Sequence, residues 1–127
     1  MRRGLRAAVW ACALVACAQI DAAATRYADA PRLAATDAAK VQVLRSDPGK
    51  PYQALGDIEV DAATDPAPPI EQIEAKLRSE AAAMGADAVV VVMDRVSVLG
   101  SHVMAGYRGR AYTVDARRVV GVAIRYR

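Results

Sequence analysis

The sequence predicts an α+β fold, a mainly antiparallel sheet of about four strands with one helix packed on one face. Two observations support this class. One segment repeats its apolar residues every three or four positions, as an amphipathic helix does, and the segments on either side of it alternate with the two-residue period of strands. The expected order is β-β-α-β-β. The roughly 110 residues that follow residue 16 suffice for one domain with one core, which we expect at residues 40–127.

The first two expected strands lie at residues 40–44 and 52–60. KVQVL and YQALGDIEV alternate between polar and apolar side chains. RSDPGKP lies between them and predicts a turn, because proline fixes one backbone angle and glycine permits a tight bend. Gly56, inside the second strand, predicts a β-bulge or the close approach of another backbone.

The expected helix runs from Pro69 to Met84. Pro69 suits the first turn, where its missing N–H costs little. Glu74 and Arg78 form an i, i+4 pair on the solvent side, and Gly85 predicts the left-handed cap that ends the helix. The apolar residues form one stripe along the helix: Ile70, Ile73, Leu77, Ala81 and Met84.

Two more strands are expected after the helix. ADAVVVVMD, residues 86–94, contains four consecutive valines, which predict a strand buried on both faces or nearly so. An extension of this strand, a Gly-rich excursion around residues 100–109 and a short strand at 111–114 follow. RVVGVAIRYR predicts the last strand, with Val120, Val122, Ile124 and Tyr126 on one face and Val119, Gly121, Ala123 and Arg125 on the other.

Residues 1–16 have the pattern of an export signal. Three arginines precede an uncharged apolar run from Ala7 to Ala16. A membrane-spanning helix needs about 20 apolar residues, roughly twice the length of this run, so the run fits the apolar core of a signal peptide.

The end of this run, Leu14-Val15-Ala16-Cys17, resembles the lipobox of bacterial lipoprotein signals. In that family the peptide is cut just before the cysteine, which carries a diacylglycerol and usually an N-acyl chain. The resemblance implies lipidation of Cys17. It also implies sorting to the outer membrane, facing the periplasm, because Ala18 and not aspartate follows the cysteine. Ordinary secretion remains the alternative, with cleavage after an A-x-A motif at residues 16–18 or 22–24.

The cysteines agree with lipidation. The chain has two, Cys12 and Cys17, and cleavage before Cys17 removes the first. The mature protein then has one thiol, at its N-terminus, and an unpaired thiol is unusual in an exported protein unless it is modified.

The charge balance gives no indication of nucleic-acid binding. Three of the 17 basic residues precede Cys17, which leaves 14 against 14 acidic residues after cleavage. The segment Ala18–Ala39 is rich in alanine, and Pro31 interrupts any helix in it. Residues 17–39 are therefore expected to be the lipidated cysteine and a flexible tether, with a short amphipathic helix on the membrane as the alternative.

Three segments resemble small bacterial envelope lipoproteins whose domain is like that of the Rcs stress-sensing outer-membrane lipoprotein and the YbjQ-like family. These segments are KVQVLRSDPGKPYQALGDIEV, LRSEAAAMGADAVVVV and GVAIRYR. The resemblance covers residues 40–127 and implies the fold. The domain of the Rcs sensor carries disulfide cysteines, whereas residues 40–127 contain no cysteine. The heavy-metal-binding label of the YbjQ-like proteins would need ligands that these residues do not supply.

No enzyme or metal site is predicted. His102 is the single histidine, and Asp94 or Asp115 beside it would make at best a weak metal site. Ser101 is its sequence neighbour, which prevents the usual serine–imidazole geometry. Asp57, Glu59 and Asp61 alternate onto one strand face, which is typical of a solvated surface. Gly85 follows the helix, whereas a phosphate-binding glycine precedes one. We expect no catalytic residue and no cofactor.

The C-terminal arginines are the one feature that suggests binding. After Asp94 there are seven arginines and one acidic residue. Guanidinium groups bind phosphate and carboxylate, as in lipopolysaccharide or peptidoglycan, but charges on a last strand also protect a sheet edge from aggregation. The candidate contact residues are Arg108, Arg110, Arg117, Arg118, Arg125 and Arg127.

These observations predict a lipid-anchored protein of the bacterial cell envelope. Its expected role is structural, sensing or protein interaction, without catalysis. The alternative is a soluble periplasmic module that binds a small anion or a metal ion.

Overall fold

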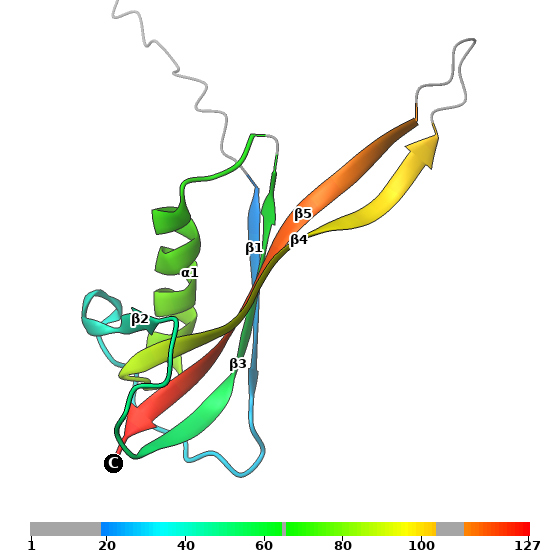
Figure 1. The fold of residues 1–127 in the computed structure, drawn as a ribbon. Coiled ribbons are helices and arrows are strands. Elements are labelled where there is room, and N and C mark those ends of the chain that lie inside the picture. Colours follow the sequence, from blue (N-terminus) through cyan, green and yellow to red (C-terminus); the bar gives the residue numbers. More distant parts are fainter. Residues whose placement is uncertain (1–18, 65, 104–110) are drawn as a thin grey trace, which may run out of the picture.

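The computed structural model describes residues 19–64, 66–103 and 111–127, which form a five-stranded sheet with one α-helix against it (Figure 1). The α+β class is confirmed. The elements in chain order are β1 (Ile20–Arg26), the 3-10 helix η1 (Ala38–Lys40), β2 (Gln42–Leu44), β3 (Tyr52–Ala63), α1 (Ile70–Ala83), β4 (Ala88–Val103) and β5 (Ala111–Tyr126).

The strand number and order differ from the prediction. The sheet order is β1-β3-β5-β4-β2, with β2 parallel to β4 and every other pair antiparallel. The first two predicted strands, β2 and β3, are therefore not neighbours, because β4 and β5 lie between them. β2 pairs with β4 over only three residues, from Gln42↔Ala88 to Leu44↔Val90. The crossover from β2 to β4 contains β3 and α1, which is the kind of connection that a parallel pair needs.

A flexible tether is the wrong description for residues 19–39. β1 pairs antiparallel with β3 from Ile20↔Ala62 to Arg26↔Gly56 and forms one edge of the sheet. The following loop is also fixed, since the Thr36 N–H donates to the Ala82 carbonyl at 2.9 Å and its Oγ1 to the Ala86 carbonyl at 2.7 Å. Alanine has too little apolar contrast to show a strand period, which is why this strand was not predicted. The folded domain begins before residue 40.

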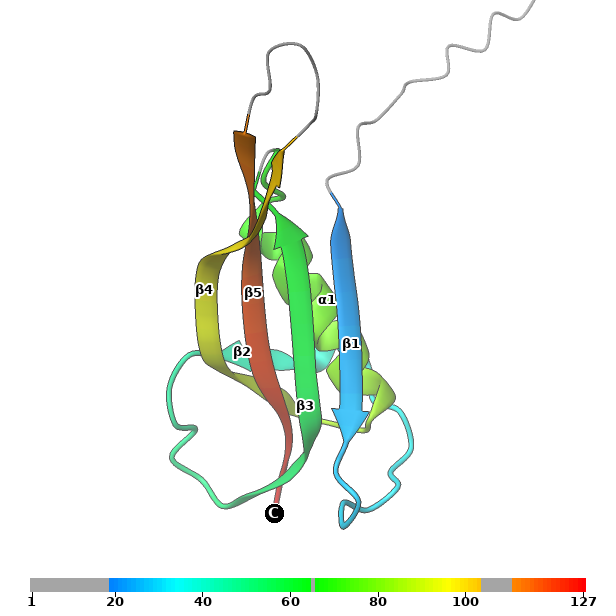
Figure 2. The same ribbon diagram turned by 90° about the vertical axis from the view of Figure 1, so that its right-hand side faces the viewer.

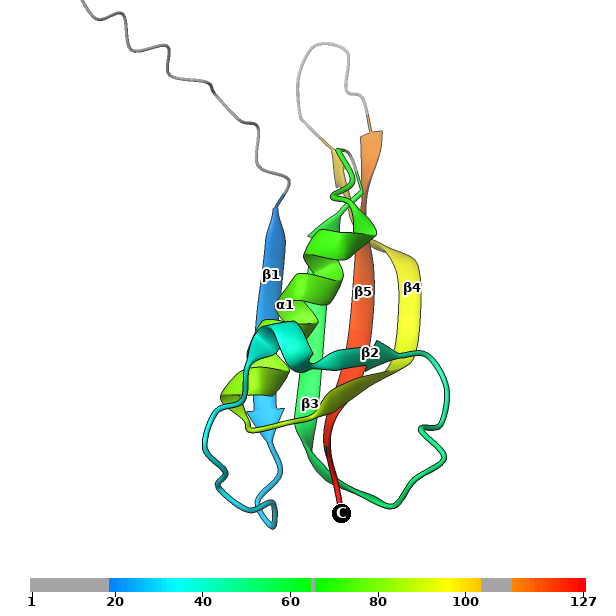
Figure 3. The ribbon, with the colours of Figure 1, turned by 90° about the vertical axis from the view of Figure 1, so that its left-hand side faces the viewer.

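One face of the sheet is covered by α1 (Figure 3). The predicted stripe is confirmed, with Ile73, Leu77 and Ala81 at most 1% exposed. They pack in one cluster with Ile58 and Val60 of β3, both 0% exposed. This burial is the main source of stability, at about 25 cal/mol per Å² of apolar surface.

Three glycines allow neighbouring segments to approach closely. An added Cβ at Gly121 would lie 2.5 Å from Val89 Cγ1 and 3.5 Å from Leu77 Cδ2, so its absence lets the helix approach the sheet. Gly85 caps α1 as predicted, with φ +82°, and a Cβ there would lie 2.5 Å from the Leu33 Cβ. The pairing of β3 with β5 shifts register between Ala54 and Gly56, which confirms the bulge. A Cβ at Gly56 would collide with the Thr25 carbonyl, which confirms the close approach.

The four valines of β4 are not buried on both faces. Val89 is 0% exposed, whereas Val92 is 60% exposed. α1 covers only one face, and a β-bulge between Val91 and Met93 shifts the alternation along the strand.

β4 and β5 continue beyond the rest of the sheet. The last β3–β5 pair is Ala63↔Ala116, whereas β4 and β5 remain paired as far as Val103↔Ala111. We call residues 98–103 and 111–114 the arm. The arm confirms the strand at 111–114 and replaces the predicted irregular excursion over residues 100–103. The rest of that excursion, residues 104–109, lies outside the described residues.

Candidate functional site

The face of the sheet opposite α1 is the main candidate for a contact surface. No element of the described chain crosses it in front of β3 and β5 (Figure 2). Side chains alternate along a strand, and directly paired residues share a face. β3 and β5 therefore place three cross-strand pairs on this side: Asp57↔Val122, Glu59↔Val120 and Asp61↔Arg118. We call the surface formed by these six residues with Val90, Val92 and Met93 of β4 the uncovered face.

The β3 half of the uncovered face is acidic. Asp57, Glu59 and Asp61 alternate with buried residues, so the prediction that they share one strand face is confirmed. Arg118 Nε lies 2.8 Å from Asp61 Oδ1 and 3.0 Å from Glu59 Oε1. The Tyr27 hydroxyl donates to Asp57 Oδ1, and this hydrogen bond raises the pKa of Tyr27 to about 12. Each carboxylate therefore has a neighbouring polar partner, but Arg118 is the one positively charged group among these partners, so it does not balance all three negative charges.

The β4–β5 half of the uncovered face is apolar. Val90, Met93, Val120 and Val122 are half-buried, and Val92 is the most exposed of the group at 60%. The bulge puts Val92 and Met93 together opposite Val120. A valine stripe beside a carboxylate row can bind a partner that presents apolar and cationic groups.

The predicted arginines that the structure describes do not form one basic surface. Arg117 and Arg118 are consecutive on β5 and so point to opposite faces. Arg117 forms a bidentate pair with Asp94, with Nε–Oδ1 and Nη2–Oδ2 distances of 2.8 and 2.7 Å. Arg45 adds a third bond to Asp94 at 3.1 Å, and the Arg117 hydrogen bond in particular holds the Asp94 pKa below its ordinary value.

Of the remaining predicted contact residues, two make hydrogen bonds to backbone carbonyls and the others lie outside the described residues. Arg125 Nη1 donates to the Gly85 carbonyl at 2.9 Å, and Arg125 Nε lies 3.6 Å from Asp87 Oδ2. Arg127 is exposed, and its backbone N–H donates to the Pro51 carbonyl at 3.1 Å. Arg108, Arg110 and Cys17 lie outside the described residues. Arg117, Arg118 and Arg125 thus make contacts within the domain.

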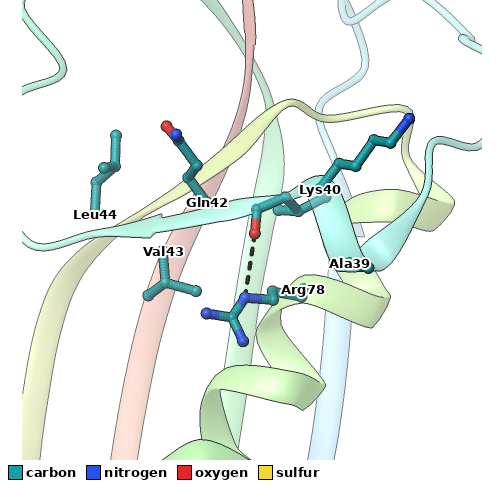
Figure 4. A pocket seen from close by; sticks show the side chains of 7 residues that line it. Ala39, Lys40, Gln42, Val43, Leu44 and Arg78 are labelled. Carbon is teal, nitrogen blue, oxygen red and sulfur yellow. Dashed lines mark hydrogen bonds between the residues drawn. The ribbon is translucent and has the colours of Figure 1, made fainter.

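A shallow groove of about 590 Å³ lies where β2 meets α1 (Figure 4). Arg78 lines it, and its Nε donates to the Val41 carbonyl at 3.1 Å, which ties the helix to the sheet edge. Its Nη2 lies 3.8 Å from Glu74, so the predicted helix pair is confirmed. The Lys40 ammonium is directed away from the Arg78 guanidinium, and the groove therefore does not bring two cations together on one anion.

The structure gives little support for a metal site or a membrane helix in the residues it describes. Within residues 19–64, 66–103 and 111–127, no three His, Cys, Asp or Glu side chains come together in a group that could hold a metal ion. None of the helices in the same residues combines the length and the hydropathy of a membrane span.

The sequence did not indicate three features of the site. The Tyr27–Asp57 bond joins residues 30 positions apart, and the Arg45–Asp94 bond joins residues 49 apart. Neither pairing has a local signal. The exposure of Val92 depends on the bulge, and a run of four valines gives no indication of where a bulge falls.

Comparison of the chain with protein-family models, with curated proteins and with solved structures found no match.

Proposed function

We propose that this protein is a lipoprotein of the bacterial cell envelope, anchored through Cys17 and acting by contact and not by catalysis. The observation that carries the proposal is the run Leu14-Val15-Ala16-Cys17, which follows a basic start and an apolar segment. The folded domain begins directly after it, at Ile20. An outer-membrane position facing the periplasm agrees with the alanine that follows Cys17.

The uncovered face is the proposed contact surface. Its valines are removed from water only when a partner covers them. This burial would favour binding by about 25 cal/mol per Å² of apolar surface. Asp57, Glu59 and Asp61 beside them favour a partner that carries lysine or arginine next to apolar side chains. We therefore propose that the partner is an envelope protein. Arg108 and Arg110 remain candidates for contact with lipopolysaccharide or peptidoglycan.

Palmitate labelling tests the anchor. Cys17→Ala should abolish incorporation of radiolabelled palmitate, and globomycin should block processing of the native chain. Two or three acyl chains give stable anchoring that does not depend on ionic contacts, so the native protein should remain with membranes after a salt wash. Cys12→Ala is the matched control, because it changes the other cysteine and should leave labelling intact. Unlabelled native protein in the soluble fraction would contradict the proposal.

Crosslinking in intact envelopes tests the contact surface. Val92→Asp adds a charge to the exposed part of the uncovered face and should reduce the amount of partner recovered with the protein. Ser79→Asp is the control, since Ser79 is exposed on α1, on the other side of the sheet. An equal loss with both variants, or no loss with either, would contradict the assignment of this face.

A further inference from the structure

The connection between the proposed lipid site and the sheet is very short. Only Ala18 and Gln19 lie between Cys17 and the first residue of β1, Ile20. An extended chain spans at most about 3.6 Å per residue, so the step from Cys17 to Ile20 covers at most about 11 Å. Gln19 is already part of the sheet, because its carbonyl accepts a hydrogen bond from the Ala63 N–H at 3.0 Å. A lipid on Cys17 would therefore hold this end of the sheet at the membrane surface.

The arm extends from the same end of the sheet. β1 begins opposite Ala62 of β3, and the arm starts just beyond the last β3–β5 pair, Ala63↔Ala116. Figures 1 and 2 show β4 and β5 running past the start of β1 at this end, while the C-terminus lies at the other. Six strand residues, 98–103, extend about 20 Å. The arm is therefore longer than the connection from Cys17 to Ile20, which spans at most about 11 Å.

The residue types of the arm suit a lipid surface. Its described residues, Val98–Val103 and Ala111–Val114, include no Asp, Glu, Lys or Arg, and Asp115, which pairs with Val98, places one carboxylate at the base of the arm. They include valine, leucine and a tyrosine, and tyrosine is enriched at the level of lipid head groups. An isolated two-stranded ribbon is only marginally stable in water, so contact with a further surface would stabilise it.

The depth of the contact follows from the backbone. In the part of the chain that the structure describes, the two strands of the arm pair only with each other. Their outer edges therefore keep N–H and C=O groups without a ladder partner, and such groups are too costly to place in the hydrocarbon layer. Head-group level is the depth at which water and polar lipid atoms can satisfy them.

We infer that the arm lies on the surface of the membrane to which Cys17 is attached, at the level of the lipid head groups. The inference rests on the proposed lipidation of Cys17, and it adds an orientation. The domain stands on the end where β1 begins, and the uncovered face extends away from the bilayer.

Depth-dependent fluorescence quenching tests this orientation with the mature, lipidated full chain. After signal cleavage and lipidation, Ser101→Cys supplies one free thiol in the arm for a bimane label. Ala28→Cys is the matched control, because it is exposed and follows the far end of β1. The probe is a vesicle of phosphatidylethanolamine and phosphatidylglycerol that contains head-group spin-labelled lipid. We expect several-fold stronger quenching at position 101 than at position 28.

A spacer between Cys17 and β1 tests whether the short connection sets the orientation. Twenty Gly/Ser residues inserted after Ala18 give a coil of about 25 Å root-mean-square span, so quenching at position 101 should fall towards the value at position 28. Equal quenching at the two positions, or no fall with the spacer, would overturn the inference while palmitate labelling remained intact. Protection of the position 101 label without vesicles, in the Cys17→Ala chain, would identify a second copy as the occupant and would also overturn it. Loss of palmitate labelling in the native chain would instead contradict the proposed function.

Discussion

The two faces of the central sheet come from the same strands but have opposite environments. On the side of α1, Ile58, Val60 and Val119 are at most 1% exposed. On the other side their sequence neighbours Asp57 and Glu59 carry charge, and Val92 is 60% exposed. Burial on one face supplies the stability of a domain with no disulfide, and it leaves the other face available for contact.

The two faces also explain why neighbouring arginines of β5 have different partners. Arg117 and Arg118 fall on opposite faces, and each meets an acid from a neighbouring strand. Such cross-strand pairs of opposite charge stabilise the pairing of neighbouring strands. Arg117 and Arg118 are therefore paired with acids from β4 and β3, and these two arginines do not form a common basic surface although they are adjacent in sequence.

The largest loss of stability is expected from a substitution on the covered face. Leu77→Ala removes a side chain that is 1% exposed, and the lost burial and the cavity should cost about 2–5 kcal/mol. Lys76→Ala is the control, because Lys76 is exposed on the same helix, and its cost should stay below about 0.5 kcal/mol. Urea unfolding of the domain that includes β1 measures both. Equal losses would show that α1 does not anchor the core.

A matched pair on β5 compares the two faces directly. Val119→Thr places a hydroxyl in the core under α1 and should cost about 1–3 kcal/mol. Val122→Thr makes the same change on the uncovered face and should alter the free energy of unfolding by no more than about 0.5 kcal/mol. The comparison fails if Val122→Thr destabilises as much as Val119→Thr.

Asp94 tests the charge pairs beside the covered face. Asp94→Asn weakens the bidentate bond to Arg117 and should cost about 1 kcal/mol at neutral pH. Because the folded-state pKa of Asp94 is lowered from 3.8, its stabilisation is complete above that value and is lost as the pH falls through the lower folded pKa. The stability difference between native and variant should thus shrink in strong acid. Asp29→Asn, which makes the same change at an exposed position, is the matched control.

Tyr27 gives the smallest expected effect, at the edge of the uncovered face. Tyr27→Phe removes the hydrogen bond to Asp57 and should cost about 0.5–1 kcal/mol. The folded-state pKa is raised from 10.0 to about 12, so this contribution is complete below about pH 10 and is lost as the pH rises to 12. The ultraviolet titration of native protein should show one late-ionising tyrosine that is missing from the variant. Tyr52→Phe, at a residue 39% exposed, should retain it.

The sequence by itself determined the helix, its stripe and cap, the strands β3 and β5, and the candidate lipid site. Each of these depends on local chemistry: a period of three and four residues, a glycine with positive φ, an alternation of apolar side chains, or a short motif before a cysteine. Only the tertiary structure decided that residues 20–26 form a strand, because alanine carries no readable period and β3 supplies the missing partner. It also decided the parallel position of β2 and the neutralisation of Arg117 by Asp94, which depend on contacts between segments far apart in the chain. Register and charge pairing are properties of two strands together, and neither strand encodes them alone.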